Sequence, residues 1–336
     1  MKRSLLALFA LATFAMFAAV ACGGDDDSGA KDGKLTKVTL MLNWTPNTQH
    51  SGIYLAREKG WYKEQGLDVE IVEPASGGVE AVVGAGKANF GISIQESVIP
   101  ARAEGVPIVS IGTIIQHNDS SLLALTSDNI KRPKDLEGKT YGGFGGPLET
   151  ALINKFVTCD GGDAKKVKFV EVGNIDYLAG MEANQFDIVW IFDGWDTIRY
   201  REVEGKKVTT LPFIEYTKCI PDWYTPLIIT SEDMAKKHAD TVKKFMAATA
   251  RGYEFARTNP DDAAAALLKA APELDAKLVK LSAKYYQDRY ADKGRAWGVQ
   301  DKDIWVNFEK FLREAKLTEK EVDVSKAYSN DFLPKK

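Results

Sequence analysis

Short apolar runs alternate with helical patterns along the first two thirds of the chain. Most of the runs are rich in Val, Ile and Leu; they occur at 37–42, 67–72, 89–94 and 107–115, and again at 167–172 and 187–192, with a further strand end at 140–142. Helical periodicity follows most of them, at 51–59, 77–86, 96–104, 148–156, 175–183 and from about Trp195. Strands separated by helices of this length predict βαβ units and a parallel sheet. Right-handed crossovers then place the ligand-facing loops at the carboxyl ends of the strands.

The last third of the chain departs from this alternation. After an apolar strand at 227–230, nearly every segment from Ser231 onward has helical periodicity, with Pro260 and Pro272 at helix starts or breaks. The order of elements is therefore α/β, then α/β again, then helices. It predicts an α/β protein with two similar lobes and a helical C-terminal region.

The chain opens with the pattern of a secretory signal. Lys2 and Arg3 precede an apolar run, which is a charged segment followed by a hydrophobic one. The small residues before Cys22 resemble a bacterial lipobox, in which the signal is cut before the cysteine and a lipid is attached to its thiol. Residues 1–21 are then a lipoprotein signal peptide, and 22–35, rich in Gly, Asp, Ser and Lys, are a flexible tether. The alternatives are an ordinary signal peptide or a membrane helix, for which the run is short.

Composition narrows the class of protein. The chain has 45% hydrophobic and 27% charged residues, which is usual for a soluble globular body. A net charge of -3 without a basic block argues against nucleic acid as a partner. The three histidines are not spaced as metal ligands, so no metal site is predicted. Cys159 and Cys219 can pair in an oxidising compartment, but their separation says nothing about geometry, and the pairing stays open.

Five segments that follow one another carry a family resemblance. They are Leu42–Ile71, Val79–Ser93, Ala101–Gln116, Asp135–Gly145 and Asp187–Trp195, and the resemblance covers nearly the whole chain after the tether. They resemble the shared domain of the thiamine-pyrimidine family, which includes thiamine-precursor-binding lipoproteins, riboflavin- and sulfonate-binding relatives, and fungal pyrimidine synthases. The resemblance implies a type II periplasmic-binding fold, a ligand between two lobes, and an ABC permease and ATPase as partners. With the strand pattern, it places lobe 1 at 36–125 plus 228–336 and lobe 2 at 126–227, with crossings near 123–127 and 224–229 that form a hinge.

The enzymatic branch of that family depends on residues that this chain lacks. The fungal synthases resemble it but carry a cofactor-binding lysine and a sacrificial histidine where this chain has Ser93 and Ser97. A serine hydroxyl forms no Schiff base with pyridoxal phosphate and provides no imidazole atoms. The run 220–225 replaces their cysteine cluster, and Lys87, the nearest lysine, precedes its strand and is expected to face away. The sequence therefore predicts a binding protein that uses no cofactor, rather than an enzyme.

Candidate ligand contacts lie where the first and third strands end. A flat heteroaromatic ligand favours the large ring of Trp44, and the Asn43 amide beside it can donate and accept hydrogen bonds. The alternatives are a Trp44 that packs the lobe and an Asn43 that shapes the turn. His50 lies further along the same loop. Gln95 follows the third strand and can present a donor and an acceptor, whereas Glu96 equally suits the first turn of a helix.

The second lobe contributes a glycine-rich turn and a cluster after a later strand. The turn at Gly143, Phe144 and Gly145 opens a helix and exposes backbone N–H groups to an anion or a polar ligand edge. It is not a P-loop, and the alternative is a tight turn that needs positive φ. Asp193 takes the position of a glutamate in the synthases by the resemblance, and a carboxylate suits an aminopyrimidine. Trp195 and Tyr224 are expected to wall the cleft.

These features predict a monomeric receptor on the outer face of the cytoplasmic membrane or in the periplasm, anchored through Cys22. Its cargo is a small heteroaromatic molecule for an ABC importer. A thiamine pyrimidine precursor is the first candidate and riboflavin the second, because aromatic residues at the strand ends favour a planar ring over an aliphatic sulfonate. Two alternatives stay open, a pyrimidine synthase and a sensor or adhesion lipoprotein with the same fold.

Overall fold

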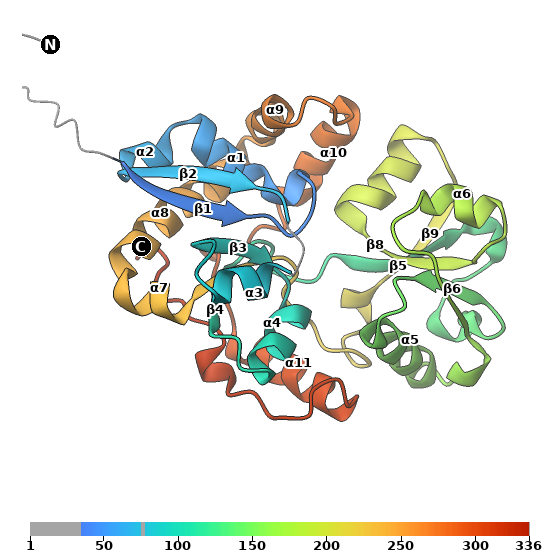
Figure 1. The fold of residues 1–336 in the computed structure, drawn as a ribbon. Coiled ribbons are helices and arrows are strands. Elements are labelled where there is room, and N and C mark those ends of the chain that lie inside the picture. The colour runs from blue at the N-terminus through green and yellow to red at the C-terminus, as the bar shows by residue number, and fades with distance from the viewer. Residues whose placement is uncertain (1–34, 75–77, 336) are drawn as a thin grey trace, which may run out of the picture. The chain divides into compact units, whose positions relative to one another are not determined.

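The computed structural model describes residues 35–74 and 78–335; Cys22, the predicted signal and nearly all of the tether lie outside them. Two five-stranded sheets organise the described residues (Figure 1). The first has the strand order β2-β1-β3-β10-β4 and the second β7-β6-β8-β5-β9. Helices lie against both sheets, which gives the two α/β lobes that the sequence predicts.

The first sheet is mixed rather than parallel. Its strands are β1 (Thr36–Met41), β2 (Leu67–Val72), β3 (Phe90–Ser93), β4 (Ile108–Thr113) and β10 (Leu227–Ser231). β1 pairs in parallel with β2 and β3, but β10 is antiparallel to β3 and β4. The expectation of a parallel sheet is wrong for β10, because the chain re-enters this sheet in the opposite direction after building the second one. The outer edge of β4 is covered by the C-terminal segment, where Ser110 exchanges backbone hydrogen bonds of 2.8 Å with Ala327 and Ser329.

The second sheet contains two strands that the sequence did not predict. It consists of β5 (Ser120–Leu125), β6 (Thr140–Gly143), β7 (Lys168–Glu171), β8 (Ile188–Phe192) and β9 (Val208–Pro212). β6 is parallel to β7 and β8, whereas the two unpredicted strands, β5 and β9, pair antiparallel with each other, and β5 also with β8. The chain therefore passes between the sheets at residues 114–119 and returns at 217–226. We call these two stretches the crossing segments. The first passage comes before the predicted crossing near 123–127, because β5 already belongs to the second sheet.

Helices cover both sheets and share a core with them. They are α1 (Ser51–Glu58), α2 (Trp61–Glu64), α3 (Val79–Gly84), α4 (Gln95–Ala103), α5 (Pro147–Cys159), α6 (Tyr177–Glu182), α7 (Glu232–Lys237), α8 (Ala239–Thr258), α9 (Pro260–Ala270), α10 (Ala276–Tyr286) and α11 (Lys302–Glu314). One apolar cluster joins the two sheets through Trp223 of the second crossing segment. The Trp223 ring stacks on Phe308 of α11 at 5.0 Å and meets the edge of Trp190 of β8 at 6.1 Å.

The second lobe has two local features of note, a pair of π-helical turns and a disulfide. The helix expected from about Trp195 begins at Asp193 and forms two π-helical turns, η5 (Asp193–Thr197) and η6 (Arg199–Val203). Such turns are rare and frequently mark functional sites. Cys159 at the end of α5 forms a disulfide with Cys219 of the second crossing segment, so the pairing that the sequence left open is present.

Candidate functional site

The carboxyl ends of strands from both sheets meet at one serine of α10. Thr48 lies in the short helix η1 (Thr48–His50) after β1, and its hydroxyl contacts that of Ser282. The Ser282 hydroxyl also donates to the carbonyl of Gly194, which lies two residues after the end of β8. Because β6 runs parallel to β8, its carboxyl end lies at the same edge. The two sheets therefore direct their strand ends toward a common region, as a ligand cleft between α/β lobes requires.

Two aromatic rings are left unusually open at these strand ends. Trp44 follows β1 and is 47% exposed, and Phe144 follows β6 and is 52% exposed. They are the two most exposed large apolar side chains in the part of the chain that the structure describes. We call Asn43, Trp44, Gly143, Phe144 and Gly145 the strand-end face; each belongs to the predicted site.

The Asn43 amide is held in place by His50. The ring Nε2 of His50 lies 3.0 Å from the Asn43 Oδ1, and its Nδ1 accepts from the backbone N–H of Asn47 at 3.3 Å. Nδ1 is thus the acceptor, so Nε2 carries the proton and donates to Asn43. Burial lowers the pKa of His50 to about 3, which keeps the ring neutral. His50 is fully buried, so the structure places it behind Asn43 as a positioning residue.

The glycine-rich turn already binds a carboxylate, and that carboxylate belongs to the protein. Glu149 of α5 accepts from the backbone N–H of Phe144 at 3.0 Å and of Gly146 at 3.0 Å, and from the Tyr141 hydroxyl at 2.9 Å. Gly145 has φ +77°, a conformation that favours glycine. The turn therefore presents the Phe144 ring outward, while two of its N–H groups are taken by Glu149.

Gln95 and Tyr224 join the first lobe to the second crossing segment. The Gln95 Oε1 accepts from the Tyr224 backbone N–H at 2.8 Å, and the Gln95 N–H donates to the Tyr224 carbonyl at 2.9 Å. Both side chains are fully buried. Next to them, burial raises the pKa of Glu96 to about 7, and the Trp223 indole lies beside its carboxyl. The structure thus brings these predicted residues together as an internal junction.

Asp193 and Trp195 lie in η5 and face different surroundings. The Asp193 carboxylate accepts from the Ser121 hydroxyl and from the Thr197 hydroxyl, the latter at 2.6 Å, and burial raises its pKa. Trp195 is partly buried and packs against the core of the first lobe. Both oxygens of Asp193 are therefore already paired inside the protein.

Asp119 is a central polar residue that sequence reasoning missed. It lies at the end of the first crossing segment and accepts from Tyr285 at 2.6 Å, from Tyr286 at 2.8 Å and from the Gly194 N–H at 3.0 Å. The Tyr286 hydroxyl in turn accepts from Gln49 of η1 at 3.1 Å. Burial raises the pKa of Asp119 to about 6. The run of polar residues at 116–121, between two apolar stretches, is the signal that could have identified it.

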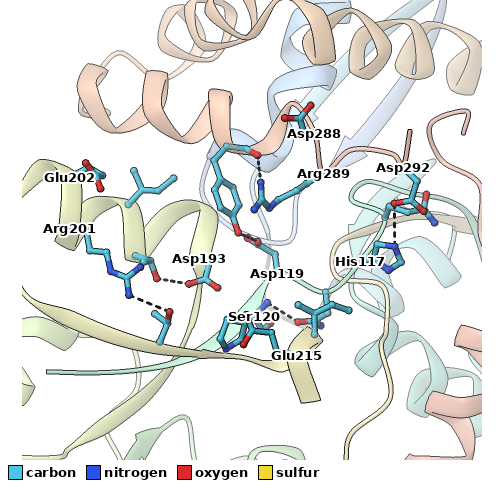
Figure 2. Close-up of a pocket in the computed structure, with 18 residues that line it drawn as sticks. His117, Asp119, Ser120, Asp193, Arg201, Glu202, Glu215, Asp288, Arg289 and Asp292 are labelled. Carbon is cyan, nitrogen blue, oxygen red and sulfur yellow. Dashed lines mark hydrogen bonds and ion pairs between the residues drawn. The ribbon is translucent and has the colours of Figure 1, made fainter. Parts of the chain in front are cut away.

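A cavity of about 700 Å³ adjoins this network (Figure 2). It lies between the first crossing segment, η5 and η6, β9 with the turn that follows it, and the end of α10; we call it the hinge cavity. Figure 2 shows Asp119 and Asp193 at its centre, with Arg201 and Arg289 on different sides. Of the predicted site residues only Asp193 lines it. No residue of the strand-end face lines the hinge cavity, so the two are distinct sites only in the sense that they share no residue.

The structure also shows the surroundings of Ser93 and Lys87, the positions on which the enzymatic alternative depends. The hydroxyl of Ser93 donates to the carboxylate of Glu80, and Lys87 is exposed in the turn before β3. Within residues 35–74 and 78–335, no group of three or more His, Cys, Asp and Glu side chains is placed to hold a metal ion. In the same residues, no helix has both the length and the apolar character needed to cross a membrane.

Comparison with known proteins adds to this geometry. A family model described as NMT1/THI5 like matches residues 47–263. The formylaminopyrimidine-binding protein of Halalkalibacterium halodurans is 26% identical over 312 residues, which cover 90% of this chain and 93% of that protein. The 4-amino-5-hydroxymethyl-2-methylpyrimidine phosphate synthase of Legionella pneumophila is 27% identical over 301 residues, covering 89% and 93%. The periplasmic aliphatic sulphonate binding protein SsuA of Escherichia coli shares the fold, with a TM-score of 0.67 at 15% identity over 87% of this chain and 91% of that one.

Proposed function

The chain belongs to the NMT1/THI5-like family, and on this premise we propose that it is a binding protein for a small heteroaromatic molecule. The proposed cargo is a thiamine pyrimidine precursor, with riboflavin as the second candidate. The proposed partners are an ABC permease and ATPase, to which a monomeric lipoprotein delivers the ligand. The name of the Halalkalibacterium halodurans relative, a formylaminopyrimidine-binding protein, supports the pyrimidine over the flavin.

The observation that carries the proposal is the exposure of Trp44 and Phe144. Large aromatic side chains are usually buried, since each ring in water forgoes about 25 cal/mol for every Å² that could be covered. Here one ring from each lobe is about half open; Trp44 lies three residues after the end of β1, and Phe144 directly follows β6 of the other sheet. Two such rings suit a flat heteroaromatic ligand, which stacks on aromatic faces.

Hydrogen-bonding groups beside the rings support a ligand with a polar edge. His50 occupies the Asn43 carbonyl oxygen, and the Asn43 NH₂ has no partner among the described residues. That group is available to donate to a ring nitrogen of a pyrimidine. We propose that Asn43, Trp44 and the 143–145 turn contact the ligand directly. Gln95, Asp193, Trp195 and Tyr224 complete the proposed site by holding the surrounding elements in position.

The pyrimidine synthase is the second candidate function, and the name of the Legionella pneumophila relative favours it. Two chemical features weigh against it. Ser93 has no amine for a Schiff base, and its hydroxyl is bonded to Glu80. Ser97 has no imidazole to give up. We therefore propose a binding protein rather than an enzyme.

An extracytoplasmic location is proposed from the N-terminal pattern, with the lipid attached at Cys22. The disulfide between Cys159 and Cys219 supports it, because such bonds persist in oxidising compartments. Replacing Cys22 with serine should move the protein from the detergent phase to the aqueous phase of a Triton X-114 partition. A wild-type protein that is already aqueous would contradict the anchor.

The test of the proposed function is ligand binding by residues 35–336. Thermal unfolding and calorimetry would be measured with hydroxymethyl- and formylaminomethyl-pyrimidine, thiamine, riboflavin, taurine and pyridoxal phosphate. A ligand of the native state at 100 times its Kd stabilises it by about 2.7 kcal/mol, so the true ligand should raise the midpoint clearly. A shift with a pyrimidine alone supports the proposal. Binding of pyridoxal phosphate with the absorbance of an internal aldimine would contradict it.

A further inference from the structure

The hinge cavity differs from the strand-end face in carrying charge rather than open aromatic rings. Two rings lie in its lining, and both contact charged groups: the Arg289 guanidinium carbon lies 3.5 Å from the Tyr285 ring centroid, and the His117 imidazole contacts Asp222 and Asp292. The lining instead offers guanidinium groups and polar side chains from both lobes.

Two arginines of the cavity lack a carboxylate partner. The structure describes ten arginines, of which seven form ion pairs within 4.0 Å; the remaining three are Arg57, Arg201 and Arg289. Arg57 lies on the first lobe, with its guanidinium over the Tyr54 ring. Arg201 and Arg289 both line the hinge cavity, one from η6 and the other from the segment just after α10. Two of the three described arginines without an ion pair thus border the same cavity.

The hydrogen bonds of these two arginines fix the orientation of each guanidinium group but do not neutralise its charge. Arg201 donates from Nε and Nη2 to the carbonyl of Val208, at 3.3 and 3.0 Å. Arg289 donates from Nη1 to the Tyr285 carbonyl at 2.8 Å. Both partners are neutral, and N–H groups on each guanidinium stay free. A guanidinium so oriented is suited to bind a carboxylate or a phosphate.

Three polar residues line the same cavity, two from the first crossing segment and one from the start of β5. Gln116, Asn118 and Ser120 are 1%, 4% and 1% exposed. Among the described residues, the Gln116 Oε1, the Asn118 Nδ2 and the Ser120 Oγ have no hydrogen-bond partner. Buried polar atoms without partners are rare in folded proteins. The three atoms are closed off from solvent, so they form a polar wall behind the cavity surface rather than direct contacts of an anion.

The acidic residues that line the cavity form no ion pair with Arg201 or Arg289. The two buried ones, Asp119 and Asp193, have their oxygens engaged by hydroxyl and N–H donors. The other four are exposed to solvent at the rim and are Glu202, Glu215, Asp288 and Asp292. Arg201 and Arg289 are exposed as well, so salt screens all of these charges alike. Neither arginine forms an ion pair with a carboxylate of the lining, so both guanidinium groups stay available to a small anion.

We propose that the hinge cavity is a second binding site, for a small anion held between Arg201 and Arg289. The chemistry admits a carboxylate or a phosphate, because both match the fork of a guanidinium. Arg201 belongs to the second lobe and Arg289 follows a helix of the first, so the bound anion bridges the lobes. This site is independent of the aromatic ligand proposed for the strand-end face.

The experiment measures anion binding by residues 35–336 with and without the two arginines. Succinate and inorganic phosphate are titrated by calorimetry at constant ionic strength, with chloride as the reference. The double variant R201Q/R289Q should lose at least ten-fold in affinity, whereas R289K should retain part of it because the charge remains. The matched control is R251Q, which removes an exposed arginine paired with Glu64 on the first lobe.

Three outcomes would overturn the proposal. They are equal binding by the wild type and the double variant, an equal loss in R251Q, and the absence of binding by either anion to the wild type. Binding of one anion only assigns the site to carboxylates or to phosphates. Pyrimidine binding is measured on the same samples and should be unchanged in the double variant. A protein that binds pyrimidine but no anion would remove this site and leave the proposed function standing.

Discussion

The strand-end face and the hinge cavity lie in one molecule, yet the residues that line them are of opposite character. At the strand-end face the departure from ordinary burial is apolar, since Trp44 and Phe144 stay open to solvent. In the hinge cavity the departure is polar, since atoms of Gln116, Asn118 and Ser120 are buried without partners. Each departure costs free energy in the protein alone. Under the two proposals, the open rings favour a flat aromatic ligand and the charged cavity favours a small anion.

Asp119 links the hinge cavity to the segment that follows β1. Its carboxylate binds Tyr285, which lines the cavity, and Tyr286, which is bonded to Gln49 in the loop after β1. Changes at Asp119 therefore affect both regions, whereas changes at Trp44 or at the arginines affect one. The predictions below use this difference, beginning with the residue that both regions share.

Asp119→Asn should have the largest effect, a loss of roughly 3 kcal/mol in the free energy of unfolding. The amide replaces one acceptor with a donor that faces the Gly194 N–H or a tyrosine hydroxyl, and a buried unpaired polar group costs about 1–3 kcal/mol. Urea denaturation measures it. Asp288→Asn, an exposed change in the same lining, is the control and should shift stability by less than about 0.5 kcal/mol. Equal stability of the two variants would remove Asp119 from this role.

Trp44→Ala should weaken pyrimidine binding about 30-fold and leave the unfolding midpoint nearly unchanged. A stacked ring buries enough area to contribute about 2 kcal/mol on binding, and the side chain is already 47% exposed in the free protein. Phe169→Ala is the matched control, because Phe169 on β7 is 41% exposed and lies outside the strand-end face. Calorimetry of both variants decides the matter. Wild-type affinity in Trp44→Ala would exclude this ring from the site.

Glu96 gives the internal junction beside the strand-end face a dependence on pH. Burial raises the pKa of Glu96 to about 7, above the ordinary value of a glutamate. The folded state therefore binds this proton more tightly than the unfolded state, and stability falls as pH rises through the folded pKa. The free energy of unfolding should decrease between pH 5 and pH 8, and Glu96→Gln should flatten the part above pH 6. The remaining slope belongs to Asp119 and Asp196, whose pKa values burial raises to about 6.

The smallest effect expected is a few-fold tightening of anion binding in the hinge cavity between pH 8 and pH 6. Burial raises the pKa of Asp119 to about 6, and a hydrogen bond with Asp222 raises that of His117, so the lining becomes less negative as pH falls. The other charged groups of the lining are Asp193, Arg201, Glu202, Glu215, Asp288, Arg289 and Asp292. Calorimetry with succinate, whose own titration is subtracted, measures the effect. Affinity that weakens toward pH 6 would contradict this arrangement of charges.

Much of the fold could be predicted from the sequence because local pattern determines it. The strands β1 to β4 and β6 to β8 alternate with helices along the chain, and each is found close to its predicted range. β5 and β9 could not be found in this way, since SSLLAL and VTTLP are short and partly polar. Their hydrogen bonds come from each other and from β8, which are distant in sequence.

The candidate site divides along the same line. Asn43, Trp44 and the 143–145 turn were identifiable because they lie just after strands, a property of local order in the sequence. Asp119 was not, because its partners Tyr285 and Tyr286 come 166 and 167 residues later. The unpaired arginines were likewise hidden, since a missing counter-ion is a property of the folded surface alone.

The disulfide between Cys159 and Cys219 has a consequence for the biogenesis of the protein. The two cysteines are 60 residues apart, and closing a loop of that size stabilises a fold by about 4 kcal/mol in the chain-entropy description. Thiols stay reduced in the cytosol and pair outside it. Under the proposed export, the nascent chain therefore lacks this stabilisation while it must remain unfolded enough to be threaded through a translocon. The disulfide forms only after the chain has crossed the membrane. There it stabilises the folded second lobe, and a folded chain does not return through the translocon.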